Sequence, residues 1–355
     1  MNTNTTPELF RHFPELRERI PWVPLARPTP VHRLERLESF LHASPIWIKR
    51  DDRTSEVYGG DKARKFEFVF GDVIRRGSGR VLAFGHAGSE HCLAVTAFAH
   101  HFRLRPVLAL RRPHRGPDVQ RILEIEHALG ADMHRLGGGP RAWLRLLRSL
   151  LTREGGRMPA RCPYILWPHR IELWGAMGYI NAAYELKRQI TVGIMPEPER
   201  IYVPVGSGAT LAGLAVGCRL AGLRSRVVGV LGAHGSRRAG RIASRLVGAL
   251  QSRSSRVRDA IGREPEFELN DRYAGGPSIA TSMAQHCIGL LRDLENLDLD
   301  PAYGARTMAA LVDDLRRQPA SGPVLFWHAH PSGVLARHRD RVVLPRELRE
   351  LFVAR

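Results

Sequence analysis

Lysine is scarce in this chain of 355 residues. Lysine and arginine together number 54, yet the only lysines are Lys49, Lys62, Lys65 and Lys187. A reaction that needs a side-chain amine therefore has four candidates. The net charge is +19, but the arginines are scattered, with no dense basic tract and no interleaved aromatic residues. This pattern argues against a nucleic-acid-binding protein and predicts a positive field that attracts small anions, such as phosphates and carboxylates.

Long apolar runs and paired cysteines are also missing. No stretch reaches the roughly 20 apolar residues that a membrane span needs, and no basic region followed by an apolar one opens the chain. The four cysteines, Cys92, Cys162, Cys218 and Cys287, form no CxxC pair and no zinc pattern. We therefore expect a cytoplasmic protein with buried, reduced thiols and no metal site.

Strand and helix patterns alternate along most of the chain. Strands are predicted at 46–48, 81–84, 106–110, 132–136, 164–167, 201–205, 227–231 and 324–327. Helices are predicted from about residue 62 and at 90–101, 119–129, 141–151, 174–189, 210–220, 279–294 and 303–315. The polar segment 252–271 is predicted as a surface loop, and a Gly/Arg/Pro-rich stretch at 154–161 interrupts the pattern. Such alternation is typical of an α/β fold with parallel sheets covered by helices, and the length suits two domains.

A glycine-rich turn follows the strand predicted at 201–205 and opens the next helix. It reads Gly206-Ser207-Gly208-Ala209-Thr210. Glycines allow a tight turn that exposes backbone N–H groups, and a helix N-terminus adds a partial positive charge, so the turn predicts a phosphate cradle. It is not a Walker loop, because no Lys-Ser/Thr pair follows, and it lacks the acidic residue of a dinucleotide fingerprint. An ordinary structural turn is the alternative.

Lys62 follows two glycines at the predicted start of a helix, in Gly59-Gly60-Asp61-Lys62-Ala63. The helix N-terminus disfavours a further positive charge, so we expect a lowered pKa for Lys62. A lysine that sheds its proton can form a Schiff base with a carbonyl group. Lys49 and Lys65 fit the alternative, a solvated surface charge, better than Lys62 does.

A second loop of small residues, Gly85-His86-Ala87-Gly88-Ser89, joins a predicted strand to the helix that begins with Glu90 and His91. It places the Ser89 hydroxyl and two imidazoles at the carboxyl edge of a parallel sheet, where active sites of open α/β sheets lie. The structural alternative is an N-cap serine followed by solvated histidines. A phosphate cradle, an amine that forms imines and a polar loop are together the parts that a pyridoxal phosphate enzyme needs.

The order of these motifs resembles the family of 1-aminocyclopropane-1-carboxylate deaminase and D-cysteine desulfhydrase. The resemblance covers nearly the whole chain and includes Ile48-Lys49-Arg50-Asp51-Asp52, the Lys62 motif, Gly178-Tyr179-Ile180-Asn181, the glycine-rich turn and Asp300-Pro301-Ala302-Tyr303. These are fold type II pyridoxal phosphate enzymes, related to the tryptophan synthase β subunit. The resemblance implies an α/β fold of two three-layer, open-sheet domains: a large one of residues 1–60 and 173–355 and a small one of 61–172. It also implies an active site in the cleft between them, and a homodimer.

The resemblance further implies roles for single residues. Lys62 would hold pyridoxal 5′-phosphate and move the α-proton of the substrate. The turn Gly206–Thr210 would bind the cofactor phosphate. Ser89 would face the substrate, and Tyr303 would line the active site, so that both position the substrate carboxylate or donate protons.

Several positions depart from the family pattern. Glu90 stands where the family has an asparagine that contacts the ring hydroxyl, and this contact would fall to Glu90 or to a neighbouring histidine, His91 or His86. Asp61 replaces the asparagine beside the cofactor lysine. In His328-Ala329-His330-Pro331, a threonine hydroxyl near the pyridine nitrogen is lost.

Two further departures lie elsewhere in the pocket. His169-Arg170-Ile171 stands in place of a Gly-Gly-Ser segment, and Phe326 stands where the deaminases carry a tyrosine. The expected surroundings of the ring are therefore altered, while the lysine and the phosphate turn are kept.

The function implied by the resemblance is a pyridoxal phosphate-dependent enzyme acting on an amino acid. Its expected reaction is elimination or deamination to a 2-oxo acid and ammonia, or a related β-replacement, which would make it a lyase, deaminase or hydrolase. The altered pocket favours an unusual amino acid. One alternative is a relative that binds the cofactor or a related ligand without turnover. A basic nucleic-acid-binding protein is the other, against which the scattered arginines argue.

Overall fold

The computed structural model describes residues 6–111, 118–136, 140–151, 163–232, 237–262, 264–275, 281–331, 344–346 and 348–349. Contacts divide the chain into two compact units. Unit 1 contains Met1–Phe70 and His169–Ser332, and unit 2 contains Gly71–Pro168 and Gly333–Arg355. Helix α3 (Asp61–Arg75) leads from unit 1 into unit 2, and α7 (Pro168–Thr191) leads back. The domain boundaries and the cleft implied by the resemblance stay predictions.

Unit 1 is built on a six-stranded sheet with the order β1-β2-β10-β7-β8-β9. The strands are β1 (Val31–Arg33), β2 (Ile46–Lys49), β7 (Arg200–Val205), β8 (Arg226–Leu231), β9 (Glu268–Asn270) and β10 (Val324–Trp327). β1 pairs antiparallel with β2, and all other neighbours are parallel. The carboxyl ends of β2, β10, β7 and β8 therefore meet at one edge of this sheet.

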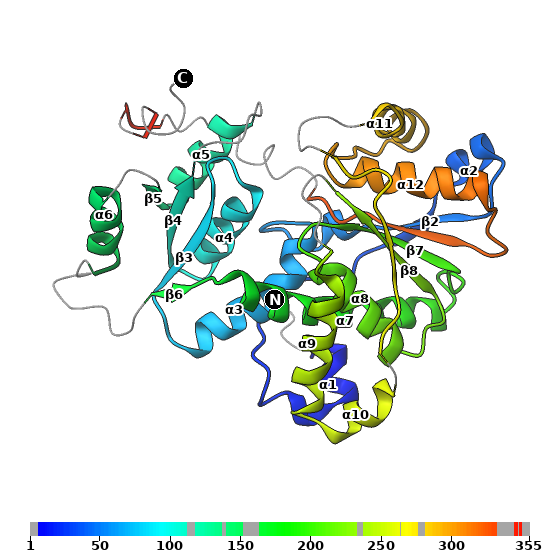
Figure 1. Ribbon diagram of the computed structural model, residues 1–355, viewed down its shortest axis with the longest axis horizontal. Coiled ribbons are helices and arrows are strands. Elements are labelled where there is room, and N and C mark those ends of the chain that lie inside the picture. The colour runs from blue at the N-terminus through cyan, green and yellow to red at the C-terminus, as the bar shows by residue number, and fades with distance from the viewer. Residues whose placement is uncertain are drawn as a thin grey trace. The chain divides into compact units, whose positions relative to one another are not determined.

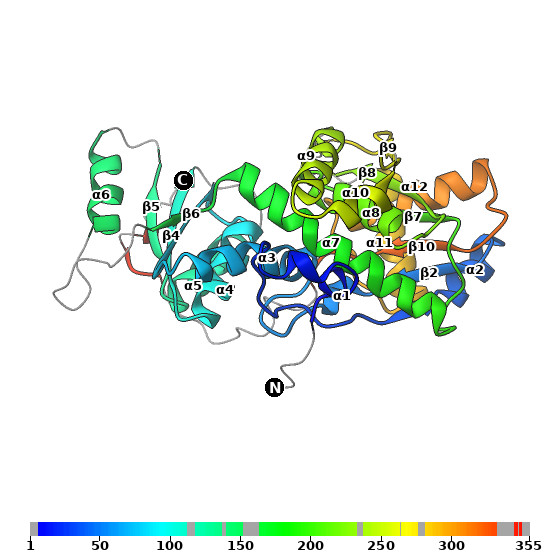
Figure 2. The same ribbon diagram turned by 90° about the horizontal axis from the view of Figure 1, so that it is seen from below.

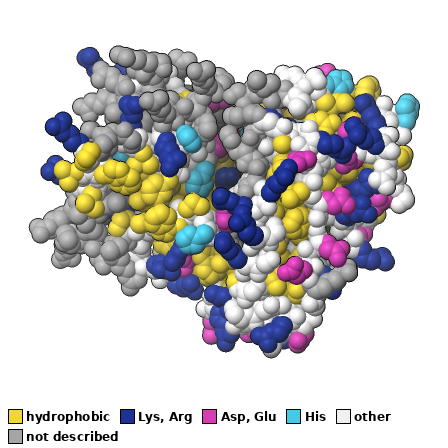
Figure 3. All heavy atoms as spheres, viewed as in Figure 1, with side chains coloured by type: hydrophobic (Ala, Val, Ile, Leu, Met, Phe, Trp, Pro, Cys, Tyr) yellow, Lys and Arg dark blue, Asp and Glu magenta, His cyan; other side chains and the backbone are white. Residues whose placement is uncertain are grey.

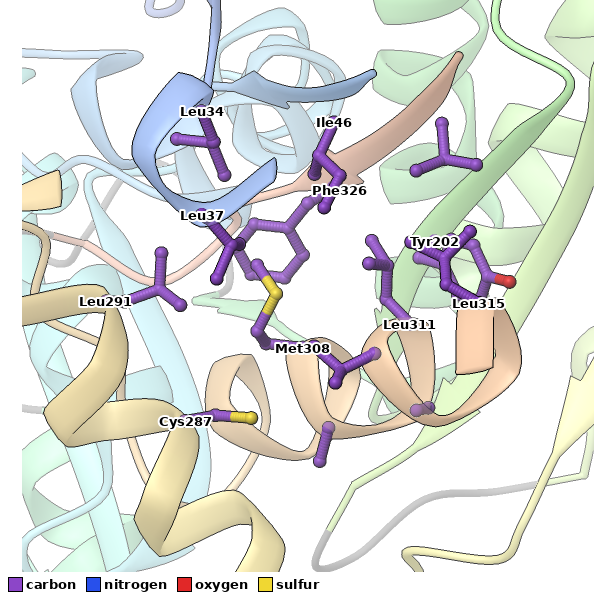
Figure 4. Packing of buried hydrophobic residues seen from close by; sticks show 14 of the residues in the cluster. Leu34, Leu37, Ile46, Tyr202, Cys287, Leu291, Met308, Leu311, Leu315 and Phe326 are labelled. Atoms are coloured by element: carbon purple, nitrogen blue, oxygen red, sulfur yellow. The ribbon is translucent and has the colours of Figure 1, made fainter. Parts of the chain in front are cut away.

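Helices cover both faces of the six-stranded sheet, as Figure 1 shows. On one face lie α2 (Glu35–Leu41), α11 (Ser282–Glu295) and α12 (Gly304–Arg317). The other face carries α7, α8 (Ala209–Leu220) and α9 (Ala239–Gln251), with α1 (Glu8–His12) and α10 (Ser255–Ile261) nearby. Phe326 of β10 packs between Leu37 of α2 and Met308 of α12 (Figure 4), and all three side chains are fully buried. Each such burial stabilises the unit by roughly 1.5–3 kcal/mol.

Unit 2 has a four-stranded parallel sheet with the order β5-β4-β3-β6. Its strands are β3 (Arg80–His86), β4 (Arg105–Arg111), β5 (Asp132–Arg135) and β6 (Tyr164–Ile165). Its helices are α4 (Glu90–His101), α5 (Val119–Ala128) and α6 (Pro140–Leu151). Figure 2 shows α6 on one side of the sheet and α4 and α5 on the other, and Leu146 of α6 packs on Leu82 and Val107. The predicted α/β class with two helix-covered open sheets is confirmed.

Most predicted elements are confirmed, two of them to the residue: Glu90–His101 and Val324–Trp327. The prediction of a loop at 252–271 was wrong, because this segment contains α10 and β9. Only Val257 and Ile261 of α10 are buried, so its polar composition hides a helix that packs by one short apolar edge. The prediction for 154–161 falls outside the described residues.

The cysteines and the charged side chains can be compared with the expectations from the sequence. Cys92, Cys218 and Cys287 are buried and unbridged, as predicted, while Cys162 falls outside the described residues. Helices with the length and apolarity to cross a membrane are absent from the described part of the chain. On the face drawn in Figure 3, the described cationic side chains are dispersed among acidic and apolar ones.

Candidate active site

Lys62 lies in the first turn of α3, which follows β2 through a connection over residues 50–60 that contains a short 3-10 helix (Asp51–Arg53). The N–H of Asp61 donates a hydrogen bond of 2.8 Å to the carbonyl oxygen of Ala329, just beyond β10. Gly60 has a φ of 75°, and a Cβ there would lie 2.6 Å from the same carbonyl oxygen, so a glycine is required. These contacts fix the start of α3 at the carboxyl edge of the six-stranded sheet.

Asp61 holds two lysines at this point. Its Oδ1 lies 2.9 Å from Nζ of Lys62, and its Oδ2 accepts a hydrogen bond from Nζ of Lys65. Burial opposes ionisation of Asp61, but the charges of Lys62 and Lys65 outweigh it and hold the pKa of this carboxyl well below its usual range. The Lys62 side chain remains 23% exposed.

The prediction that Lys49 and Lys65 are solvated was wrong. Lys49 is fully buried, because β2 lies inside the sheet, and its Nζ pairs with Glu185 of α7. Lys65 is also buried, because α3 packs closely on α7: a Cβ on Gly175 would lie 3.1 Å from Cγ of Lys65. Burial lowers the pKa values of both ammonium groups. The lowered pKa expected for Lys62 stays a prediction.

A buried ion network lies below the start of α3. Arg64 donates hydrogen bonds of 2.8 and 2.7 Å to the Asp51 carboxylate and one of 2.9 Å to Glu185. The Trp327 indole N–H also donates to Asp51, at 2.6 Å. With Lys49, the network holds two cations and two carboxylates, so its net charge is zero. Our sequence reasoning gave these residues no role, although a charged run directly after a buried strand, at the carboxyl edge, was an available signal.

The turn Gly206–Thr210 joins β7 to α8 at the same edge of the sheet. Gly208 has a φ of 99°, and a Cβ there would approach the backbone of Ala239 to 3.0 Å. Ser207 is exposed, and its Oγ accepts a hydrogen bond of 3.4 Å from the N–H of Ala209. The tight turn and the N-terminal N–H groups of α8 form a cradle that fits a phosphate group.

Tyr303 lies against this turn. A Cβ on Gly206 would be 3.6 Å from the Tyr303 ring and 3.7 Å from its hydroxyl oxygen, and a Cβ on Gly232, beyond β8, would be 2.2 Å from the ring. The Asp300 carboxylate accepts hydrogen bonds from the N–H groups of Tyr303 (2.7 Å) and Gly304 (2.8 Å) at the start of α12. Asp300, to which we assigned no role from the sequence, therefore fixes Tyr303 beside the phosphate cradle.

Ser89, Glu90 and His91 belong to unit 2, at the carboxyl end of β3. Oγ of Ser89 accepts a hydrogen bond of 3.2 Å from the N–H of His91, so the structural interpretation of Ser89 as an N-cap is confirmed. Glu90 is exposed in the first turn of α4, where a carboxylate is favoured by the helix dipole. The substrate and cofactor contacts expected of these three residues stay predictions.

The segment after β10 carries the altered His328-Ala329 pair. His328 is 3% exposed, and burial lowers its pKa to about 4, so it is neutral near pH 7. Its ring stacks on Phe326 with the centroids 5.8 Å apart. In the part of the chain that the structure describes, no cluster of histidine, cysteine or carboxylate side chains could hold a metal ion.

Unit 1 thus places three features at one sheet edge: the amine of Lys62, the predicted phosphate cradle at Gly206–Thr210 and the phenol of Tyr303. Lys62 follows β2 along the chain and the turn follows β7, with β10 between these two strands, and Tyr303 comes directly before α12. These residues fit a phosphorylated aldehyde such as pyridoxal 5′-phosphate, which needs an amine partner and an anion site.

Comparison with known proteins gives the same result. Residues 23–329 match the family described as pyridoxal-phosphate dependent enzyme. The chain is 30% identical over 330 residues to D-cysteine desulfhydrase of Salmonella paratyphi C. The aligned region covers 90% of this chain and 96% of that protein. It is similar to the crystal structure of an ACC deaminase homologue, with 26% identity, a TM-score of 0.70 and coverage of 92% of this chain and 95% of that one.

A more distant structure shares the fold. An L-serine ammonia-lyase of the fungus Rhizomucor miehei matches with a TM-score of 0.58 at 18% identity, over 87% of this chain and 95% of that one. The family match spans most of the chain, and the desulfhydrase match spans nearly all of both proteins. The chain therefore belongs to the pyridoxal-phosphate-dependent enzymes and, among them, to the family of D-cysteine desulfhydrase and ACC deaminase.

Proposed function

We propose that this enzyme removes the amino group of a small amino acid by elimination or deamination, giving a 2-oxo acid and ammonia. The observation that carries the proposal is that Lys62, the Gly206–Thr210 turn and Tyr303 lie at the same, carboxyl edge of the unit 1 sheet. The relatives are named as a desulfhydrase and a deaminase, which supports lyase or deaminase chemistry. They do not support the further expectation of a hydrolase.

In this proposal the cofactor, when bound, supplies an electron sink for the bonds at the substrate α-carbon. The protein supplies binding and orientation. Backbone N–H groups of the Gly206–Thr210 turn hold the phosphate, and Nζ of Lys62 is the amine that bonds to the cofactor.

Lys62 is also the group that we propose moves a proton at the substrate α-carbon. Its Nζ must be neutral to accept a proton and charged to return it. Asp61, 2.9 Å away, favours the charged form, while the nearby charge of Lys65 and the helix N-terminus favour the neutral form. These opposed influences suit an amine that changes its charge during each turnover.

We propose that Tyr303 and Ser89 position the substrate carboxylate or donate a proton. Support for Tyr303 comes from its contact with Gly206 and from the Asp300 carboxylate that fixes it. The proposed roles of Ser89, and of Glu90 or His91 at the ring hydroxyl, rest on the family resemblance.

The test is product formation by purified protein loaded with pyridoxal 5′-phosphate. D-cysteine, 1-aminocyclopropane-1-carboxylate, L-serine and L-threonine are supplied in turn, and the 2-oxo acid and ammonia are both quantified. We expect equal amounts of the two from at least one substrate, no product with Lys62→Ala, and at least about a tenfold lower kcat with Tyr303→Phe. Tyr184→Phe is the matched control, because Tyr184 stacks on His12 instead. Product formation by Lys62→Ala at the wild-type rate would contradict the proposal.

A second candidate is a relative that binds the cofactor without deaminase turnover. It is favoured by the position of Ala329, which is buried beside the Lys62 turn and carries no hydroxyl. This candidate predicts a visible absorption band from bound cofactor, lost in Lys62→Ala, but no ammonia from any amino acid. A β-replacement enzyme would instead consume an added thiol and release product only in its presence.

We also propose that the enzyme is a cytoplasmic homodimer, as the family resemblance implies. Analytical ultracentrifugation of the loaded protein tests the dimer: a single species at twice the mass of the chain supports it, and a monomer at micromolar concentration contradicts it.

A further inference from the structure

A cavity of about 350 Å³ lies in unit 1, bounded by the N-terminal segment, α3 and the C-terminal half of α7. Figure 2 shows α1 beside α7, and the N–H of Leu9 donates a hydrogen bond of 3.0 Å to Asn181 across this boundary. The residues that line the cavity include none of Lys62, the Gly206–Thr210 turn and Tyr303. Its volume lies at the lower end of the range of small-molecule sites, roughly 300–1,000 Å³.

One part of the lining is apolar. It consists of Pro7, Trp22, Pro28, Val192 and Ile194. Val192 is 62% exposed and Ile194 is 50% exposed, although both are large hydrophobic residues. A ligand with an apolar body would cover this surface and gain the hydrophobic free energy of doing so.

The rim of the cavity is cationic. Arg11, Arg27 and Arg188 line it, and their side chains are 48%, 56% and 69% exposed. Glu8 serves two of them, at 2.9 Å from Arg11 and 4.0 Å from Arg188, while Arg27 pairs with Glu56 outside the lining. Three cations therefore face two carboxylates, which leaves a positive excess for an anionic group of a ligand.

The floor of the cavity adds little charge to repel such an anion. Arg64 and Glu185 satisfy each other within the neutral buried network. The Glu67 carboxyl accepts hydrogen bonds of 3.2 Å from the N–H groups of Leu25 and Ala26. Burial also raises the pKa of Glu67 to about 7, which reduces its negative charge near neutral pH.

The floor also connects to the Lys62 turn. Arg64 and Glu67 lie on α3, two and five residues after Lys62. Arg64 donates a hydrogen bond to the carboxylate of Asp51, and the backbone carbonyl oxygen of Asp51 accepts one of 2.9 Å from the N–H of Gly60. A ligand in the cavity would therefore contact the helix that carries the cofactor lysine.

We propose that this cavity is a second, regulatory binding site for a small organic acid with one carboxylate and an apolar body. The cationic rim binds the carboxylate, the apolar wall covers the body, and contact with α3 transmits the effect. Binding at this site does not depend on the proposed reaction, whereas its regulatory effect rests on the proposed role of Lys62.

The probe is 4-methylpentanoate, which has no amino group and so cannot bond to the cofactor aldehyde as a substrate does. Calorimetric titration of the loaded enzyme should give saturable binding, whereas acetate and 4-methylpentanol should bind at least about tenfold more weakly. The double variant Arg27→Gln, Arg188→Gln should weaken binding by at least about tenfold, because charge-assisted hydrogen bonds are lost. The matched control is Arg226→Gln, an exposed arginine that pairs with Glu268 and does not line this cavity.

Lys62→Ala separates the cavity from the cofactor site, since binding of the probe should be retained in this variant. The proposal is overturned by absence of saturable binding to the wild-type enzyme, by equal weakening in the rim and control variants, or by loss of binding in Lys62→Ala. Hydrogen exchange tests the regulatory part. The amides of α3 should exchange at least about threefold more slowly with the probe bound, and an unchanged rate there would overturn regulation through α3.

Discussion

Replacing Arg64 with methionine should destabilise unit 1 far more than the same change at a surface arginine. The guanidinium is 3% exposed and joins Asp51, at 2.7 and 2.8 Å, to Glu185, at 2.9 Å. Its removal leaves the buried Asp51 carboxylate and the part-buried Glu185 carboxylate opposed by Lys49 alone. Breaking a buried pair in this way typically costs about 3–5 kcal/mol, because an uncompensated charge stays inside.

Arg226→Met provides the matched control. Its guanidinium lies 3.1 Å from Glu268, a similar distance, but the two side chains are 57% and 54% exposed. Solvent screening limits such a pair to less than about 1 kcal/mol. The two variants therefore differ in the burial of the arginine and in the number of carboxylates that lose it as a partner, two for Arg64 and one for Arg226.

The assay is urea unfolding combined with hydrogen exchange and mass spectrometry, because a chain of two units need not unfold in one step. Exchange should become about 150- to 5,000-fold faster in α3 and α7 for Arg64→Met and change less than about fivefold for Arg226→Met. Equal effects of the two substitutions would refute the assignment of stability to this network.

Three further substitutions test other features. Burial raises the pKa of Glu67 from 4.5 to about 7, so between these pH values the folded state binds more protons than the unfolded chain and loses stability as the pH rises. Glu67→Gln should abolish this loss and, in urea titrations above pH 7, be more stable than the wild type by about 3 kcal/mol. A difference in stability that is the same at all pH values would contradict this prediction. Gly208→Ala should weaken retention of pyridoxal 5′-phosphate at least about tenfold, as measured by dialysis and absorbance. The reason is that an alanine at this φ of 99°, close to the backbone of Ala239, would strain the cradle. The control Gly222→Ala should retain the cofactor, because Gly222 also has a positive φ, of 64°, but a Cβ there meets no other atom. Glu126 is fully buried in unit 2, and neither of its carboxyl oxygens has a hydrogen-bond partner among the described residues. Glu126→Met should therefore increase the free energy of unfolding by about 1–3 kcal/mol and raise the melting temperature. A lower melting temperature would show that the carboxyl group is hydrogen-bonded.

The elements that could be predicted from the sequence are those with strong local patterns. Continuous apolar runs indicated β7 and β10, and the apolar spacing around α4 gave its bounds. The glycines at 206 and 208 indicated a phosphate cradle, because the requirement for a tight turn before a helix is local. Lys62 could be selected because the chain has few other lysines and because its motif is shared with a known family.

Tertiary contacts set the features that the sequence did not reveal. Lys49 and Lys65 have the same local composition as surface lysines, and their burial depends on carboxylates 136 residues away, at Glu185, or one turn back, at Asp61. Helix α10 is mostly polar, and its two buried side chains stabilise it only when neighbouring helices cover them. Ser89 carries both a local role, as an N-cap, and a predicted one at the substrate, and a pattern cannot separate the two.

The central claim is that Lys62 is the lysine that binds the cofactor. The enzyme loaded with pyridoxal 5′-phosphate is treated with borohydride, which fixes the cofactor to its amine, and then digested and analysed by mass spectrometry. With four lysines in the chain, the modified peptide identifies the amine without ambiguity. The account predicts one phosphopyridoxyl group per chain, on Lys62. A group on Lys49, Lys65 or Lys187, or no modification at all, would contradict it.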